Sequence, residues 1–333
     1  MRIRDKNVLV TGGAGFIGSH LAEHLTERNF VRLLDDFSTG CWENIATFAG
    51  QGNVQVVEGD VTDEQTVRSA CADVDVVFHL AVSCLRTSLA DPMASHNVNA
   101  GGTLHLCRAA QACGVERFVY ISSSEVYGTA CETPMAETHR LEPMTVYGAA
   151  KLAGELYAKA FHRTYGLPTV IVRPFNTYGP REPWRGTRAE VIPRFILQTL
   201  SDKAPVIFGD GTQSRDFTYV DDTVIGILLA AECDALVGDV VNIARGEEVS
   251  IARVASMVTE QVGGAVSSLA PSFAPRRPGD VMRHWADCSK ARRLLGFQAR
   301  TGFREGLRRS IEWFREHAAD TLLANAHAGE ANW

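Results

Sequence analysis

The chain has 333 residues, of which 45% are hydrophobic and 22% charged, with a net charge of −6 and a pI near 5.9. This is an ordinary globular composition, and its charge gives no reason to expect attraction to nucleic acid or to a membrane surface. No apolar run approaches the ~18–20 residues that a transmembrane helix needs. The first predicted strand begins too early to leave room for a signal peptide, so we expect a cytoplasmic protein. The eight cysteines form no C-x-x-C pair and no zinc-like spacing, which indicates reduced thiols and no metal site.

The most informative stretch is residues 8–36. A short apolar run predicts a strand buried on both faces, and a helical pattern follows it. A second apolar segment then ends in two acids, Asp35 and Asp36. Between the first strand and the helix lie three glycines in the spacing G-x-x-G-x-x-G: Gly12, Gly15 and Gly18.

This order of features predicts dinucleotide binding. Gly12 permits a tight turn out of the strand, Gly15 allows close approach to a pyrophosphate, and Gly18 allows the helix to pack on the sheet. The helix N-terminus offers free N–H groups to the phosphates. Asp35 can accept a hydrogen bond from a ribose 2′-hydroxyl and would repel the 2′-phosphate of NADP, so we expect NAD.

Strands and helices alternate through the next 130 residues. Further strands are expected at 54–60, 74–81, 117–122 and 167–173, and helices at 94–113 and 147–165. This alternation predicts an α/β fold with a doubly wound parallel sheet, in which ligands bind at the carboxyl ends of the strands. His79 lies within one predicted strand and is expected to be a core histidine.

Tyr147 and Lys151 begin the helix at 147–165 and share one face, because they are four residues apart. A free tyrosine titrates near ~10, too high for a base at neutral pH. A neighbouring ammonium and a positive nicotinamide ring both favour the phenolate. The pair can therefore accept a proton from a sugar or alcohol hydroxyl, and Ser123, at the end of a predicted strand, can orient the same oxygen.

Beyond residue 173 the alternation weakens. Helices are expected at 190–200 and 223–231, the second capped by Asp221 and Asp222, and a strand at 240–244 is expected to return to the sheet. Residues 271–283 form a basic, proline-rich loop. Arginines here and at position 215 could clamp a diphosphate, because guanidinium forks match phosphate oxygens.

Taken together, these segments resemble the extended short-chain dehydrogenase/reductases of the nucleotide-sugar epimerase/dehydratase group, to which UDP-glucose 4-epimerase belongs. The resemblance runs from about residue 6 to about 315. It rests on the motifs TGGAGFIGSH, DDFSTG, GDVTD, HLA, NVNAGGT, SSSEVYG, YGAAK, RPFNTYGPR, GDGTQSRDF, YVDD and RRPGDV.

The resemblance implies a Rossmann NAD-binding domain at 1–173, with a returning segment near 215–245, and a nucleotide-sugar-binding domain at 174–316. A flexible tail would occupy 317–333. NAD would stay bound through each catalytic cycle, and homodimers would form through a four-helix bundle. Tyr147 would take the proton of the sugar C4 hydroxyl, with Lys151 holding the nicotinamide ribose. The diphosphate would be contacted by Asn176, Arg215 and Arg276 or Arg277. The NAD contacts would be Gly12, Gly15, Phe16, Ile17, Gly18, Asp35, Asp36, Asp60, Val61, Leu80, Ala81, Asn99, Tyr147 and Lys151.

Ser124 and Glu125 leave the reaction open. The expected activity is a UDP-sugar 4-epimerase, which passes through a transient 4-ketone. Simple 4-epimerases usually carry uncharged residues at these positions, whereas UDP-glucuronate decarboxylases carry Ser-Glu and 4,6-dehydratases Asp-Glu. Glu125 acting at C5 would therefore favour a decarboxylase or dehydratase, whereas Ser124 counts against an ordinary dTDP-glucose-type dehydratase. A non-catalytic NAD-binding module is a third reading, against which the presence of Ser123, Tyr147 and Lys151 argues.

Overall fold

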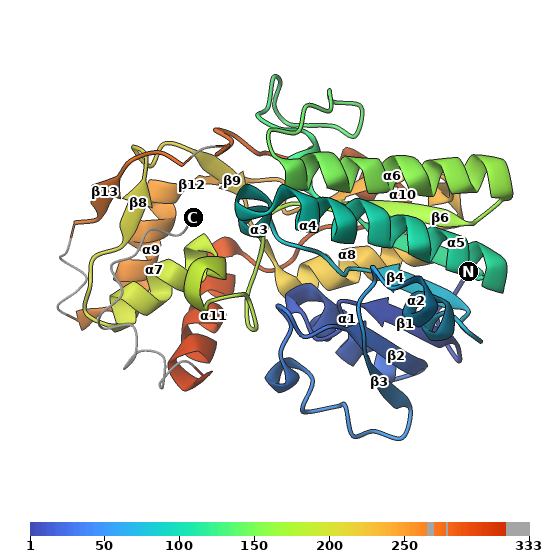
Figure 1. Cartoon of the computed structure of the whole chain (residues 1–333). Helices are drawn as coiled ribbons and strands as arrows, with labels where there is room; N and C mark the ends of the chain where they lie inside the picture. Colours follow the sequence, from blue (N-terminus) through green and yellow to red (C-terminus); the bar gives the residue numbers. More distant parts are fainter. Residues whose placement is uncertain (265–269, 278, 318–333) are drawn as a thin grey trace.

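A seven-stranded parallel sheet organises the structure (Figure 1). The computed structural model describes residues 1–264, 270–277 and 279–317. The strand order is β11-β6-β5-β4-β1-β2-β3. Strands β2 and β3 are added on one side of β1 and the later strands on the other, as in a Rossmann fold. The strands are β1 (Asn7–Thr11), β2 (Phe30–Asp35), β3 (Val54–Glu58), β4 (Val76–His79), β5 (Arg117–Ile121), β6 (Thr169–Pro174) and β11 (Val240–Ile243). The doubly wound α/β fold is confirmed, and the expected strand at 240–244 pairs with β6.

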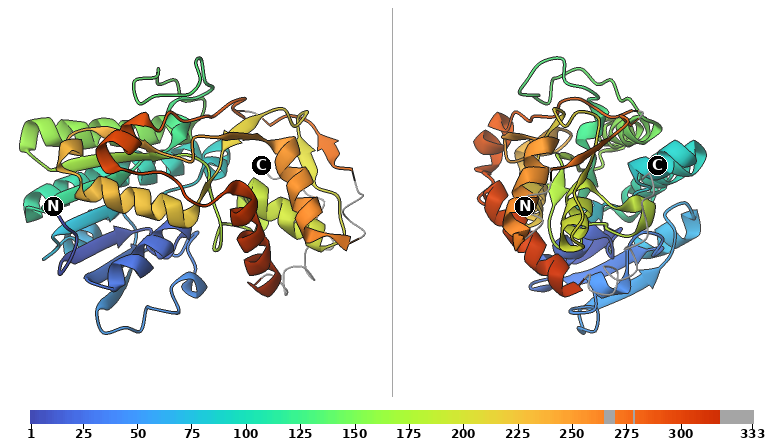
Figure 2. Two further views of the ribbon diagram at one scale, coloured as in Figure 1. Left: turned by 180° about the vertical axis from the view of Figure 1, so that it is seen from behind. Right: turned by 90° about the vertical axis from the view of Figure 1, so that its left-hand side faces the viewer.

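Helices cover both faces of the sheet. α1 (Phe16–Thr26), α8 (Val220–Glu232) and α10 (Ser289–Leu295) pack on one face, seen from behind in Figure 2. α2 (Glu64–Ala70), α5 (Thr103–Cys113) and α6 (Val146–Tyr165) pack on the other. Alternate residues of a strand point to opposite faces, so Val8 and Val10 lie in the core under α1 while Leu9 lies in the core under α5.

The segment that leads into α5 is helical except at Asp91, and it is irregular. It consists of α3 (Leu85–Ala90), α4 (Pro92–His96) and a π-helical stretch, Asn97–Gly102, which continues into α5. The helix predicted at 94–113 is therefore present with a π-helical segment inside it. π-Helical segments are often found at functional sites, and this one lies next to the loop that follows β4.

The later part of the chain forms a smaller packing unit. α7 (Val191–Leu200), α9 (Ile251–Val262) and α11 (Phe303–His317) pack against one another at the left of Figure 1. Three two-stranded ladders accompany them: β7 (Thr177–Tyr178) with β10 (Thr218–Tyr219), β8 (Val206–Phe208) with β13 (Ser272–Ala274), and β9 (Ser214–Asp216) with β12 (Glu248–Ser250). The 3₁₀ turns are Trp42–Asn44, Ser124–Val126, Gly186–Arg188 and Asp234–Leu236.

One local prediction is wrong. Asp221 and Asp222 do not cap α8, because the helix begins at Val220 and both acids lie in its first turn. The Asp222 carboxylate instead accepts the N–H groups of Arg300 and Thr301, which holds the segment before α11 against α8. The expected flexible tail lies outside the described residues apart from His317, the last residue of α11.

His79 is a core histidine, as predicted. It is 1% exposed, and its two ring nitrogens contact the hydroxyls of Thr11 and Thr103 at 2.7 and 2.9 Å. Burial holds its pKa well below the usual value, so the ring is neutral. It links β1 and β4 to α5 and carries no chemistry at the cavity.

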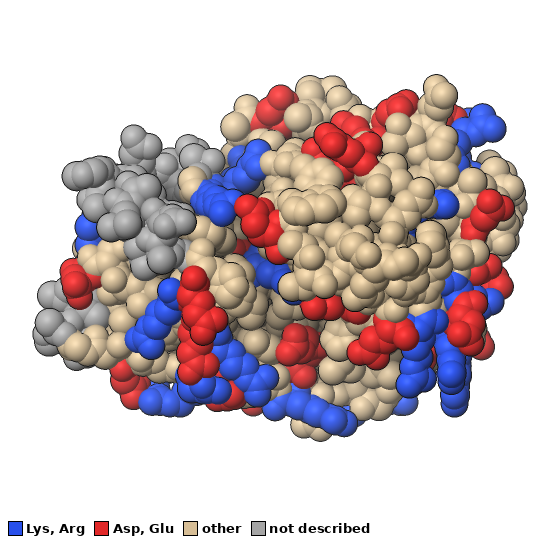
Figure 3. Space-filling model, turned by 90° about the horizontal axis from the view of Figure 1, so that it is seen from below, with Lys and Arg blue, Asp and Glu red and all other residues tan. Residues whose placement is uncertain are grey.

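Surface charge is mixed on the face shown in Figure 3, where Lys and Arg side chains alternate with Asp and Glu. Within the described ranges, no helix combines the length and apolarity needed to cross a bilayer. The same residues contain no cluster of three or more His, Cys, Asp or Glu side chains suited to a metal ion.

Candidate active site

A cavity of about 1050 Å³ opens at the carboxyl ends of the central strands. The loops after β1, β2, β4 and β5 line one end, and the segment around α7, β8 and β9 lines the other. This is the position where parallel α/β sheets bind ligands, beside the reversal of strand order. The cavity therefore joins the glycine motif to the arginine-rich second half of the chain.

The glycine motif forms a cradle that side chains would fill. A Cβ at Gly12 would lie 2.7 Å from the backbone nitrogen of Ala81, and the residue has a φ of +70°. A Cβ at Gly18 would lie 2.0 Å from the Gly12 carbonyl oxygen. Only glycine allows β1, α1 and the loop after β4 to approach this closely. The N-terminus of α1 faces the cavity, as a pyrophosphate site requires.

Asp35 ends β2 at the same end of the cavity. Its carboxylate oxygens accept the N–H groups of Ala14 at 2.8 Å and Phe37 at 2.9 Å, so it also fixes the glycine loop. Burial raises its pKa, and these N–H bonds oppose the shift. Each oxygen retains a lone pair, and the side chain lines the cavity where a ribose 2′-hydroxyl could donate to it.

Tyr147 and Lys151 reach the middle of the cavity from the first turns of α6. Thr145 caps this helix by accepting the Gly148 N–H at 3.1 Å. A Cβ at Gly148 would lie 2.7 Å from the Glu125 carbonyl oxygen, so glycine lets α6 meet the turn that carries Ser123. Burial raises the pKa of Tyr147, and the nearby Ser123 hydroxyl opposes this shift. The predicted trio is therefore assembled from the end of β5 and the start of α6.

Lys151 is 3% exposed and donates from Nζ to the Ile121 carbonyl at 2.5 Å. Its ammonium lies 4.6 Å from the centre of the Tyr120 ring. Burial lowers the Lys151 pKa to about 7, and Glu155 opposes this shift. Burial also raises the pKa of Tyr147. The phenolate that a base requires must therefore be stabilised by positive charge placed beside it.

Ser124 and Glu125 lie in the 3₁₀ turn after β5 and face His284. The His284 ring contacts the Gly128 carbonyl through Nε2 at 2.9 Å and the Ser124 hydroxyl through Nδ1 at 3.4 Å. Burial lowers the pKa of His284 to about 3, so the ring is neutral. Its one proton must be on Nε2, because a carbonyl only accepts, and Nδ1 accepts from Ser124. Burial raises the pKa of Glu125 to about 7, against the opposing effect of Arg215.

The far end of the cavity is basic. Arg215 in β9 is paired with Asp280 at 2.6 Å, and the Arg277 guanidinium lies 4.0 Å from the centre of the Phe208 ring. Burial and neighbouring arginines lower the pKa of Arg277 to about 10. Its Nε and the Asn176 Oδ1 are buried without a hydrogen-bond partner among the described residues. Unsatisfied buried groups of this kind are suited to a polar ligand with several acceptors and donors, such as a nucleotide diphosphate.

Comparison with known proteins agrees with this geometry. Residues 9–310 match the family model described as GDP-mannose 4,6 dehydratase. The chain belongs to the family of NAD-dependent nucleotide-sugar epimerases and dehydratases. It is 34% identical over 313 residues to a putative UDP-glucose 4-epimerase from Methanocaldococcus jannaschii, covering 93% of this chain and 99% of the relative.

Other members of this epimerase/dehydratase family show its range of reactions. A UDP-N-acetyl-alpha-D-glucosaminuronate decarboxylase from Bacillus cytotoxicus is 33% identical, with 93% of this chain and 98% of the relative covered. A UDP-glucuronic acid 4-epimerase from Bacillus cereus, crystallised with UDP-glucuronic acid and NAD, superposes with a TM-score of 0.87 at 34% identity. That match covers 93% of this chain and 99% of the structure.

Two residues that were predicted to contact NAD or the diphosphate do not line the cavity. Asn99 does not line the cavity, because its amide is bonded to the backbone of Ser83 at 2.9 Å through both the oxygen and the nitrogen. It supports the loop after β4 from behind. Arg276 is exposed and donates to the Asp280 carbonyl, whereas Arg277 lines the cavity. The other predicted site residues all line the cavity.

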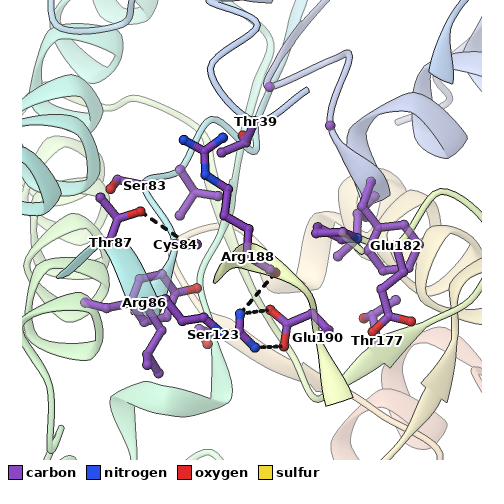
Figure 4. Close-up of a pocket in the computed structure, with 18 of the residues that line it drawn as sticks. Thr39, Ser83, Cys84, Arg86, Thr87, Ser123, Thr177, Glu182, Arg188 and Glu190 are labelled. Carbon is purple, nitrogen blue, oxygen red and sulfur yellow. Dashed lines mark hydrogen bonds and ion pairs between the residues drawn. The ribbon is translucent and has the colours of Figure 1, made fainter. Parts of the chain in front are cut away.

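Several lining residues were not predicted. Arg86 and Glu190 form an ion pair across the cavity (Figure 4), and Glu182 also lines it. Arg188 donates to the Ser38 carbonyl beside the NAD end. Cys84 also lines the cavity, with Sγ 3.4 Å from the Thr87 hydroxyl. Most of these residues lie shortly after the family motifs HLA (79–81) and RPFNTYGPR (173–181), which were the available signal. The Arg86–Glu190 contact joins residues 104 positions apart and leaves no local pattern.

Proposed function

We propose that this chain is a UDP-sugar 4-epimerase that acts through a transient 4-ketone of the sugar. The observation that supports this most directly is the position of Tyr147, Lys151 and Ser123. They lie in one cavity between a glycine-lined end suited to NAD and an arginine-lined end suited to a diphosphate. A sugar attached to that diphosphate would extend towards the trio.

In the proposed mechanism the Tyr147 phenolate removes the proton of the sugar C4 hydroxyl, and Ser123 donates a hydrogen bond to the same oxygen. NAD, when bound, supplies the acceptor for the C4 hydride and returns it. Lys151 holds the ribose next to the reacting carbon, and its ammonium stabilises the phenolate. Tyr147 then gives the proton back after the ketone has presented its other face, which inverts C4.

The diphosphate is proposed to bind Arg215, Arg277 and Asn176, and the NAD adenosine ribose to bind Asp35. Asp36, Asp60, Val61, Leu80 and Ala81 would complete the wall around the NAD, with Phe16 and Ile17 at the N-terminus of α1. This assignment follows from the lining of the cavity and from the unsatisfied atoms at its basic end.

A second candidate reaction is decarboxylation or dehydration. It is favoured by Glu125, whose carboxyl lines the cavity and has a pKa raised to about 7 by burial. A group that titrates near neutrality can accept or donate a proton at C5 of a 4-keto sugar. Ser124, beside it, is hydrogen-bonded to the neutral His284 ring and offers no strong acid.

The experiment is product analysis. The purified protein is incubated with NAD and, separately, UDP-glucose, UDP-glucuronate, UDP-N-acetylglucosamine and dTDP-glucose, and products are identified by mass and proton NMR. A product of unchanged mass with C4 inverted is the expected result. Loss of water or carbon dioxide would contradict the epimerase and establish chemistry at C5 or C6. Absence of any turnover would contradict both reactions and favour the non-catalytic NAD-binding module.

We also propose the remaining features of the resemblance. The division is a Rossmann domain at 1–173 with a returning segment near 215–245 and a nucleotide-sugar domain at 174–316. A homodimer through the helices near 94–113 and 147–165 is supported by exposed apolar side chains on or next to them: Met93, Val146 and Leu156. Sedimentation velocity tests the dimer, and a cytoplasmic location is proposed from the unpaired cysteines.

A further inference from the structure

Arg86 and Glu190 meet across the cavity in a fork-to-fork ion pair. Arg86 lies in α3, and Glu190 immediately precedes α7 in the smaller packing unit. Nη1 contacts Oε1 and Nη2 contacts Oε2, each at 2.8 Å (Figure 4). The Arg86 side chain is only 12% exposed. A planar guanidinium and a carboxylate aligned in this way form the strongest common type of protein ion pair.

The pair lies near the reacting groups. The charge of Glu190 contributes to raising the pKa of both Tyr147 and Glu125, so it is within electrostatic range of both side chains. Ser123, Arg86 and Glu190 line the same cavity. A sugar placed with C4 at Tyr147 would therefore have its neighbouring substituents close to this pair.

An arginine fork in a sugar site is the group with which a protein recognises a carboxylate, because the two N–H donors match the two carboxylate oxygens. Here both terminal nitrogens of Arg86 are already taken by Glu190. A uronate entering the site would have to displace a side chain of the same chemical kind. The Glu190 side chain, which is 43% exposed, would then lose its ion-pair partner and remain close to the incoming carboxylate, which repels it.

We propose that Glu190 is a specificity-determining residue: by occupying the Arg86 fork it selects neutral sugars, such as hexoses and N-acetylhexosamines, over uronates. The inference rests on the proposed function for the placement of the sugar. The Glu190 carboxylate takes the place on Arg86 that the carboxylate of a uronate would otherwise occupy.

The test compares two ligands on wild type and Glu190→Gln, both loaded with NAD. Affinities for UDP-glucose and UDP-glucuronate are measured by calorimetry, and kcat/KM where turnover occurs. Wild type should favour UDP-glucose by about tenfold or more. Glu190→Gln frees the Arg86 fork. The ratio of the affinity for UDP-glucuronate to that for UDP-glucose should then rise by about tenfold or more, the size expected for one charge-assisted contact.

Two controls separate the fork from a general change of charge. Glu247→Gln removes a carboxylate that pairs with Arg245 at 2.8 Å and does not line the cavity, so its ratio should equal that of wild type. Arg86→Met combined with Glu190→Gln removes the fork as well, and the gain for UDP-glucuronate should disappear. Glu190→Asp keeps the charge and should stay near wild type, which tests the proposal even if Glu190→Gln fails to fold.

An unchanged ratio in Glu190→Gln, a wild type that already prefers UDP-glucuronate, or an Asp variant that gains the uronate would each overturn the proposal. Calorimetry measures affinity independently of turnover. If the protein binds UDP-glucose without inverting C4, the proposed epimerase activity is contradicted, and the measured affinities still test the selection by Glu190. Binding of neither nucleotide sugar would overturn both.

Discussion

Replacing Glu125 with glutamine should stabilise the protein at alkaline pH and leave it almost unchanged at acidic pH. The Glu125 side chain is only 15% exposed, and burial raises its pKa from the usual 4.5 to about 7. The folded protein therefore binds the Glu125 proton more tightly than the unfolded chain does. The stability from this proton is complete below pH 4.5 and is lost as pH rises through about 7.

The size of the effect follows from the difference between the two pKa values. A rise of the Glu125 pKa from 4.5 to about 7 lowers the free energy of unfolding by about 3 kcal/mol at pH 8. Glutamine is close in shape to the neutral acid and does not titrate. The free energy of unfolding of Glu125→Gln should thus exceed that of wild type by up to about 3 kcal/mol at pH 8 and match it near pH 4.5.

The assay is urea unfolding of both proteins at several pH values between 4.5 and 8, with the same NAD concentration throughout. Glu132→Gln, at an exposed position, is the matched control and should show no such trend. A stability difference between Glu125→Gln and wild type that is the same at every pH would refute the reasoning, because it would mean that the carboxyl is not desolvated. Activity measured on the same variant would show whether Glu125 also takes part in the reaction.

Three further predictions concern catalysis, cofactor choice and the core. Tyr147→Phe should lower kcat by about 10² to 10⁴ while leaving nucleotide-sugar affinity similar, and unchanged turnover would contradict the assigned base. Wild type should prefer NAD to NADP by about a hundredfold, since Asp35 would face the 2′-phosphate, and Asp35→Asn should narrow that preference in a binding titration. Arg173→Met should lower the free energy of unfolding by about 3–5 kcal/mol, because it leaves the fully buried Glu155 carboxylate without its partner at 2.6 Å; a loss below 1 kcal/mol in urea unfolding would be inconsistent with this.

The Rossmann part of the fold could be predicted because its determinants are local. Buried strands of a parallel sheet are continuous apolar runs, and Gly18 is required by a backbone contact with Gly12 within one βαβ unit. The face shared by Tyr147 and Lys151 follows from helical spacing alone. The glycine motif therefore indicated the NAD end from the sequence, and the helical spacing brought together the two residues that are proposed to react.

The tertiary structure decided which polar side chains face the cavity. Arg276 and Arg277 are adjacent in sequence, but only Arg277 lines the cavity, and Asn99 holds a loop from behind instead of lining it. Arg86 and Glu190 are brought together from segments 104 residues apart. Such contacts depend on how helices pack around the sheet, because direction and burial are set by three-dimensional packing and not by the order of residues. The sequence by itself determined the cofactor cradle and the trio at its edge, and packing determined the charged lining from which substrate selection is inferred.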